Sequence, residues 1–356
     1  MKKKIIGVLS ALCITSLNSL NVYAMGNYID QSSNTDSEFL RNEIRVNAGV
    51  CIHPTKEYKL FDISGNPTYK CVEFTNQDGK TGFGVIDLTT YKVIMYALDA
   101  TIPFDDSDVV ICGGPLCFAV VDTKSNRATD PLTGTSILLS DLLNNTRAHL
   151  SVVSENEKII ELNEVCCDND LSAYATAASY VLVDGGDDNE LVFESGSNSG
   201  SWSTDCGINS VAMYLYHMSE YFSLDIEHTY ERSLKIALAE ISDEIIGDTT
   251  GLTMTDLAEL TNAYLDDCCS SSFDTVSKTT YSWSRYKNRI DDGDGEPCIL
   301  YIGARDTSFW NTNHAVLGTG YTSGATSTSG YIHVNSGQTN LRYVDISTSI
   351  PGYIIK

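Results

Sequence analysis

A cysteine at the start of a strongly amphipathic segment constrains this chain more than any other feature. It is Cys206, in the run Trp202-Ser-Thr-Asp-Cys-Gly-Ile-Asn-Ser, and apolar residues follow it at intervals of three and four, at Ile208, Val211, Ala212, Leu215, Met218 and Phe222. This spacing predicts a helix that begins near Cys206 and buries one face. The backbone amides and the positive dipole end of such a helix favour a thiolate over a thiol. Cys206 is therefore a candidate nucleophile.

Two later segments supply a base and an orienting group. His314 opens the apolar run Asn313-His-Ala-Val-Leu-Gly-Thr-Gly-Tyr, and Asn335 ends the run Tyr331-Ile-His-Val-Asn. Both runs are typical of strands, and two neighbouring strands of this spacing can bring the two side chains together. A nucleophilic cysteine needs a base, and the base needs a group that orients its ring. The sequence therefore predicts acyl-transfer chemistry at Cys206, His314 and Asn335.

This order of motifs resembles the papain-like cysteine peptidases, and the Asp205-Cys-Gly and His314-to-Tyr321 runs are similar to those of their secreted bacterial branch, the streptopain-like and bacteriocin-leader-peptidase-like proteins. The residues between agree, with helices expected in 251–265 and 283–290 and a buried strand in 297–302. The resemblance covers about 190–356. It implies an α+β fold in which a helical part and an antiparallel sheet form the catalytic domain. It also implies a protein or peptide substrate, with no metal and no cofactor.

One element departs from the family pattern. These enzymes usually carry a glutamine about six residues before the cysteine, where its side chain helps to hold the oxyanion, and this chain has Gly200 there. Losing one such donor typically costs on the order of 100-fold in rate. The side chains that can donate instead are those of Asn198, Ser203 and Thr204. Residues beside the motifs that are candidates for lining the cleft are Trp202, Trp310 and Asn313.

The amino terminus predicts export. Three lysines at 2–4 precede an apolar segment that reaches about Leu20, and Val22-Tyr-Ala follows with small residues at the cleavage position, so 1–24 is expected to be a signal peptide. The formal net charge of −24 disfavours binding to nucleic acid or to an anionic membrane. No apolar segment after Ala24 is long enough to span a bilayer. We expect a secreted protein, held at a cell surface only by a partner if at all.

The front half, 25–190, is expected to be β-rich. Leu60–Ile63 with Tyr69–Phe74, and Gly82–Asp87 with Lys92–Ala97, have the pattern of two hairpins. The half contains no nucleophile and base of its own, and it resembles the sheet-rich prodomains of streptopain-like enzymes. That resemblance implies an intramolecular inhibitor. The glycine-containing, acidic and small polar residues of 184–201 predict an exposed linker before the catalytic domain, 191–356, and hence a zymogen.

The remaining cysteines leave alternatives open. Without Cys13 and Cys206 their number is odd, so they cannot all pair within one chain: Cys51, Cys71, Cys112, Cys117, Cys166, Cys167, Cys268, Cys269 and Cys298. Structural thiols are favoured over disulfides, and metal binding comes last because no pair of these cysteines shows the two-residue spacing of a zinc knuckle.

Two function classes other than a peptidase also remain. One is a weak or inactive papain-like binding or adhesion protein, and the other is an amidase that cuts cell-wall peptides.

Overall fold

The computed structural model describes residues 35–132, 134, 136–142, 159–161, 180–187, 206–247, 252–270, 273–291, 295–303, 313–336, 342–347 and 352–355. Residues Leu40–Lys356 form one compact unit. The other unit is Met1–Phe39, of which the structure describes only 35–39. The expected signal peptide and most of the expected linker, including the 190/191 boundary, lie outside the described residues.

The front half is built of short antiparallel strands that follow the helix α2 (Thr35–Ala48). Four of them pair in sequence order: β1 (Ile52–Leu60), β2 (Tyr69–Asn76), β3 (Thr81–Asp87) and β4 (Lys92–Ala97). A second sheet holds β5 (Val109–Gly114), β6 (Cys117–Asp122), β7 (Arg127–Thr129) and β8 (Ser136–Leu138), and the short helix α3 (Leu139–Leu142) follows. Two further strands are β9 (Ile159–Glu161), which pairs with β1, and β10 (Tyr180–Leu182).

The predicted hairpin of 82–87 with 92–97 is confirmed, and the first strand of the predicted hairpin of 60–63 with 69–74 is wrong. β3 and β4 pair as expected, with Asp87 opposite Lys92. The strand that pairs with β2 is the more polar segment Ile52–Leu60 rather than Leu60–Ile63. Phe61 instead forms a bridge to Ile111, and both residues are buried. The apolar residues after Leu60 therefore reflect packing between two sheets, which the hairpin pattern does not reveal.

The back half begins with three helices and continues with strands. The helices are α4 (Cys206–Phe222), α5 (Glu231–Ile245) and α6 (Met254–Cys268), and then come β11 (Ser277–Thr279), α7 (Trp283–Asp291), β12 (Cys298–Gly303), β13 (Asn313–Thr322), β14 (Tyr331–Asn335), β15 (Arg342–Asp345) and β16 (Gly352–Ile355). The predicted helices at 206–222, 251–265 and 283–290 and the strands at 297–302, 314–321 and 331–335 are confirmed within a few residues. Thr253 caps α6 with a complete capping box, which explains why that helix begins at Met254.

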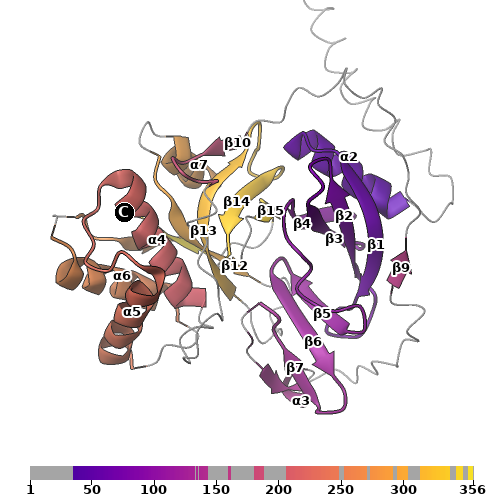
Figure 1. Ribbon diagram of the computed structural model, residues 1–356, viewed down its shortest axis with the longest axis horizontal. Coiled ribbons are helices and arrows are strands. Elements are labelled where there is room, and N and C mark those ends of the chain that lie inside the picture. The colour runs from indigo at the N-terminus through magenta and orange to yellow at the C-terminus, as the bar shows by residue number, and fades with distance from the viewer. Residues whose placement is uncertain are drawn as a thin grey trace, which may run out of the picture. The chain divides into compact units, whose positions relative to one another are not determined.

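Strands from both halves belong to one sheet. Among the described residues, 12 strands form a continuous antiparallel sheet in which β15 of the back half pairs with β4 of the front half. Tyr343 lies opposite Tyr96 at this junction, and their rings stack with centroids 4.6 Å apart. The structure is thus an α+β fold with a curled antiparallel sheet (Figure 1).

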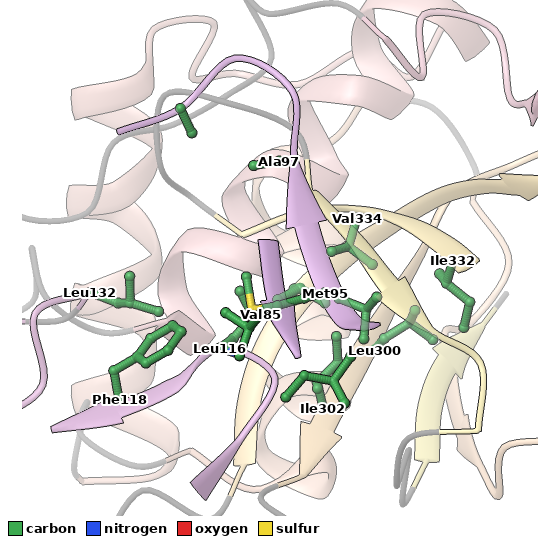
Figure 2. Close-up of a cluster of buried hydrophobic side chains, with 14 of the residues drawn as sticks. Val85, Met95, Ala97, Leu116, Phe118, Leu132, Leu300, Ile302, Ile332 and Val334 are labelled. Carbon is green, nitrogen blue, oxygen red and sulfur yellow. Dashed lines mark hydrogen bonds between the residues drawn. The ribbon is translucent and has the colours of Figure 1, made fainter. Parts of the chain in front are cut away.

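The two faces of β12 and β13 bury different sets of side chains. Ile299, Tyr301, Ala315 and Leu317 pack with α4, α5 and α6 in one cluster. The residues that alternate with them, including Leu300, Ile302 and Val316, point to the other face. There they pack with α7 and with front-half strands in a second cluster, part of which is drawn in Figure 2. Both faces are buried because strand residues alternate in direction, which is why these strands are almost continuously apolar.

The two glycines of the His-Ala-Val-Leu-Gly-Thr-Gly-Tyr run allow close packing on both sides of β13. A Cβ on Gly320 would clash with the Val181 carbonyl oxygen, in the paired strand β10. A Cβ on Gly318 would lie 2.6 Å from Leu300 Cδ1. Position 320 therefore requires glycine because a backbone carbonyl of β10 occupies the space of a side chain. Position 318 requires it because the Leu300 side chain of the core does.

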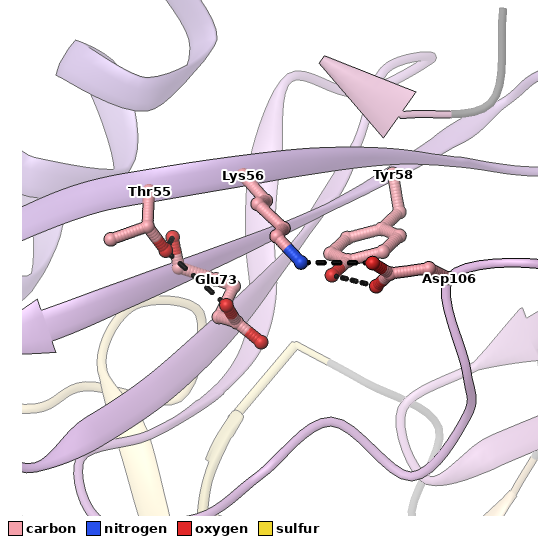
Figure 3. A network of polar contacts seen from close by, with 5 residues as sticks. All are labelled: Thr55, Lys56, Tyr58, Glu73 and Asp106. Carbon is pink, nitrogen blue, oxygen red and sulfur yellow. Dashed lines mark hydrogen bonds and ion pairs between the residues drawn. The ribbon is translucent and has the colours of Figure 1, made fainter. Parts of the chain in front are cut away.

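A polar network secures the front half. The Tyr58 hydroxyl donates to Asp106 Oδ1 at 2.9 Å, and Lys56 Nζ donates to Asp106 Oδ2 at 2.9 Å (Figure 3). Thr55 Oγ1 donates to the carbonyl oxygen of Glu73 at 3.2 Å on the neighbouring strand. The hydrogen bonds from Lys56 and Tyr58 hold the pKa of the Asp106 carboxyl below its usual range. The network thus connects β1 with β2 and with the loop after β4.

Candidate functional site

Cys206 is the first residue of α4, as the sequence predicts. The predicted apolar stripe of this helix is buried up to Met218, with Ile208, Val211 and Leu215 fully inaccessible, and Phe222 at its end is partly buried. Cys206 itself is partly buried and packs against the same cluster that contains Ala315, the residue directly after His314. No acidic side chain occupies the first turn of α4 from Cys206 on, and Asp205 directly before it lies outside the described residues.

His314 and Asn335 lie on paired strands at the same end of the sheet. β13 and β14 are antiparallel, His314 is the second residue of β13, and Asn335 is the last of β14. Their side chains are 3% and 2% exposed. Asn335 lies opposite Leu317, so His314 is offset from it by three residues, about 10 Å along the strand. An odd offset also directs regular strand residues to opposite faces, so a His314–Asn335 contact stays a prediction.

The helix α4 packs against β13 in the cluster that contains Ala315 and Leu317. A Cβ on Gly185 would touch the Tyr221 ring near the end of α4, and the Val183 amide donates to Thr319 O at 2.9 Å. The end of α4 therefore lies near Thr319. From Tyr221 back to Cys206 the helix rises about 22 Å, and from Thr319 back to His314 the strand covers about 17 Å. These similar lengths predict that Cys206 lies towards the His314 end of β13. His314 pairs with Ile302, so alternation along the strand directs it to the face opposite Ala315 and α4, and a Cys206–His314 contact stays a prediction.

A front-half hairpin lies close to Cys206. His314 lies opposite Ile302, and Ile302 belongs to the same buried cluster as Leu116 and Phe118 of the β5–β6 hairpin (Figure 2). Burial raises the pKa of the adjacent Cys117 thiol well above its usual value, and neighbouring Cys112, Asp130 and Cys206 add to the effect. The tip of this hairpin thus neighbours Cys206 at the start of α4, and it shares a buried cluster with Ile302, the strand partner of His314.

Leu116 has an unusual backbone conformation at that tip. Its φ is +58°, a left-handed value that is uncommon for a leucine, and its side chain is fully buried. Its amide donates to Met95 Sδ at 3.3 Å. The surrounding packing therefore holds the hairpin tip in a conformation that leucine does not favour by itself.

Several predicted residues cannot be located. Asn198, Trp202, Ser203, Thr204 and Trp310 lie outside the described residues, so the oxyanion donor and the cleft lining stay predictions. Asn313 begins β13 and pairs with Gly303. Asn209, which the sequence analysis did not select, lies one turn after Cys206 with its side chain buried, and its amide has no hydrogen-bond partner among the described residues. The sequence feature that could have indicated Asn209 is a polar residue among the apolar residues of a helix expected to be buried.

Most other described cysteines are unsuited to nucleophilic chemistry. No disulfide joins any of the eight that the structure describes, and four are buried: Cys71, Cys112, Cys117 and Cys298. Burial raises the pKa of the Cys298 thiol to about 12, and that of Cys71 well above its usual value. A thiol that stays protonated near neutral pH is a poor nucleophile. Cys13, Cys166 and Cys167 lie outside the described residues.

A second buried histidine lies close to Asn335 and was also missed. His333 is 1% exposed, and its Nδ1 is 2.7 Å from Thr319 Oγ1. Its ring packs edge-on against Tyr343, with centroids 4.9 Å apart. Burial lowers the pKa of His333 from 6.5 to about 4, so the imidazole is neutral at ordinary pH. This marks His333 as a core residue that supports the strand carrying Asn335.

We expect His333 to make folding stability depend on pH. Its pKa is lower in the folded chain than in the unfolded one, so the stability it contributes is present above about pH 6.5 and is lost as the pH falls towards about 4. Linkage predicts a loss of about 1.4 kcal/mol between pH 7.5 and pH 5.5. Urea unfolding of the wild type and of His333→Gln at both pH values checks this. The variant should lose less stability than the wild type. Equal losses in both would contradict the assignment.

No family model matches the chain, and no curated protein matches it significantly. Among the described residues, no helix is both long enough and apolar enough to cross a lipid bilayer. The functional assignment therefore depends on the geometry of Cys206, His314 and Asn335 and on the resemblance of their motifs.

Proposed function

We propose that this protein is a secreted cysteine peptidase of the papain-like type, made as a zymogen, with Cys206 as nucleophile and His314 as general acid and base. One observation supports most of the proposal: α4 begins at Cys206, packs against the face of β13 that carries Ala315, and ends near Thr319. This arrangement favours a position for Cys206 towards the end of the sheet where His314 begins β13. A helix start favours the thiolate, and a histidine beside it can accept and return the proton.

The reaction is an acyl transfer in two stages. The Cys206 thiolate attacks the peptide carbonyl carbon, and the backbone amide of Cys206 helps to stabilise the oxyanion. His314, as imidazolium, protonates the amine as the C–N bond breaks, which leaves a thioester on Cys206. A water then gives a proton to His314 and attacks the thioester, and the thiolate leaves as the carboxylic acid forms. Asn335 is assigned to orienting the imidazole.

The zymogen part of the proposal is supported by the β5–β6 hairpin. Cys117 of the front half lies close to Cys206, and Leu116 belongs to the buried cluster that contains Ile302, the strand partner of His314. A substrate backbone needs access to the same place. We therefore assign the front half as an inhibitor that covers the site until the chain is cut in 184–201 and the front half is displaced.

Labelling with a peptidyl epoxide, which alkylates activated cysteines, tests the nucleophile. We expect one adduct at Cys206 once the linker is cut and the front half is displaced with mild denaturant, and much slower labelling of the intact chain. Cys51 is a suitable internal control because it is also only partly buried. Mass spectrometry of tryptic peptides identifies the labelled site. No adduct at Cys206, or equal labelling of Cys51, would favour a binding protein instead, and digestion of peptidoglycan but not casein would favour the amidase.

A further inference from the structure

Two segments far apart in sequence bring three metal-binding side chains together beside the helices. The residues after α4 run antiparallel to the end of α6, where the Glu227 amide donates to Cys268 O at 3.0 Å and Ile226 forms a bridge with Cys269. As a result a Glu227 carboxylate oxygen, a His228 ring nitrogen and the Cys268 sulfur all lie within 4.8 Å of one another. Sequence spacing does not reveal this group, because Cys268 follows His228 by 40 residues.

A buried tyrosine orients the histidine of this group. The Tyr264 hydroxyl is 3.2 Å from His228 Nδ1, and Tyr264 is fully buried on α6. With Nδ1 engaged in this way, Nε2 is the ring nitrogen left for a ligand. Metal-binding histidines are usually oriented by such a hydrogen bond to the other ring nitrogen. Tyr264 therefore supplies the outer support that a metal site needs.

The local charge also favours a cation. Cys268 is the last residue of α6, and no basic residue occupies the last turn of that helix. The negative end of its dipole is therefore not balanced by its own side chains. Ile226 and Leu265 are buried in the core beneath, so the backbone that carries the three ligands is held in place.

We propose that Glu227, His228 and Cys268 bind one Zn²⁺ ion, with water as the fourth ligand. Nitrogen, sulfur and oxygen donors together suit zinc rather than calcium or magnesium, which take oxygen ligands. Tetrahedral zinc with bonds of 2.0–2.3 Å places its ligand atoms about 3.3–3.8 Å apart. The three atoms must therefore approach by about 1 Å, a shift that side-chain rotation can supply, because Glu227 is exposed and the other two are only partly buried. The ion would join the segment after α4 to the end of α6.

Metal titration of the full-length chain tests this site independently of peptidase activity. The chain carries Cys206→Ser to remove the other candidate thiolate and is kept reduced. Zn²⁺ is added in competition with a chromogenic chelator, and Co²⁺ is added separately to detect thiolate coordination by its charge-transfer absorption. We expect one equivalent of Zn²⁺, a raised unfolding midpoint with Zn²⁺, and a Co²⁺ thiolate band.

Two variants and two matched controls decide the outcome. His228→Ala and Cys268→Ser should each weaken Zn²⁺ binding at least tenfold, and Cys268→Ser should also abolish the Co²⁺ thiolate band. Cys269→Ser and His53→Gln, which change the same residue types elsewhere, should leave both readouts unchanged. Unfolding of the metal-free variants checks that they are folded. Equal Zn²⁺ affinity in the parent chain and in the His228→Ala and Cys268→Ser variants would overturn the proposal. A Co²⁺ thiolate band that is lost in Cys269→Ser but kept in Cys268→Ser would also overturn it.

Discussion

Replacing Cys206 by alanine should reduce peptide hydrolysis about 1,000-fold or more, because no other group at the start of α4 can form the thioester. His314→Ala should cost about 100- to 10,000-fold, the range expected for losing a general acid and base. Asn335→Ala should cost at least tenfold less than His314→Ala, because Asn335 exchanges no proton with the substrate and is offset from His314 by three residues. Steady-state hydrolysis of a fluorogenic peptide by the linker-cut chain, with the front half displaced, measures all three.

The folding of these variants provides the control. Cys206 is partly buried at a helix terminus, so its alanine variant should unfold at nearly the same urea concentration as the wild type. Cys51→Ala changes a partly buried cysteine in the front half and should keep full activity. Full activity in Cys206→Ala would place the nucleophile elsewhere. Equal rates for the wild type and His314→Ala would remove His314 from the mechanism even if Cys206 were essential.

Cleavage of the linker alone should leave the two halves together and only weakly active. The β4–β15 pairing and the cluster shared by Leu116, Phe118 and Ile302 both cross between the halves, so cutting 184–201 breaks no contact in either. We expect the cut pieces to elute together in size-exclusion chromatography. Activity should rise at least tenfold when the front half is displaced by dilution or mild denaturant, and added front half should inhibit it again.

A charge at the hairpin tip tests the same covering role. Leu116→Asp places a carboxylate in a fully buried position, so in the cut chain it should release the front half and raise peptide hydrolysis. Leu138→Asp is the matched control, because Leu138 on β8 is 46% exposed. It should leave inhibition unchanged. A cut, non-dissociated chain that is fully active, or equal activity in both aspartate variants, would show that the front half does not cover the site.

The sequence by itself determined the local elements of the proposed site. The three-and-four spacing after Cys206 predicts α4 and its first residue, because a helix that packs on a core must carry an apolar stripe. The apolar runs that begin at His314 and end at Asn335 predict β13 and β14 and their pairing for a similar reason. Both signals depend on neighbours within a few residues, which is the range over which periodicity has meaning.

Contacts between distant segments were decided only by the tertiary structure. The polar strand β1 has no apolar pattern of its own and is stabilised by pairing with β2 and β9. The junction of β4 with β15 joins residues about 250 positions apart, and no local pattern encodes which strand edges meet. Glu227, His228 and Cys268 likewise converge only because α4 and α6 pack together. Side-chain periodicity specifies which face of an element is buried, whereas the partner of that face is selected by packing of the whole chain.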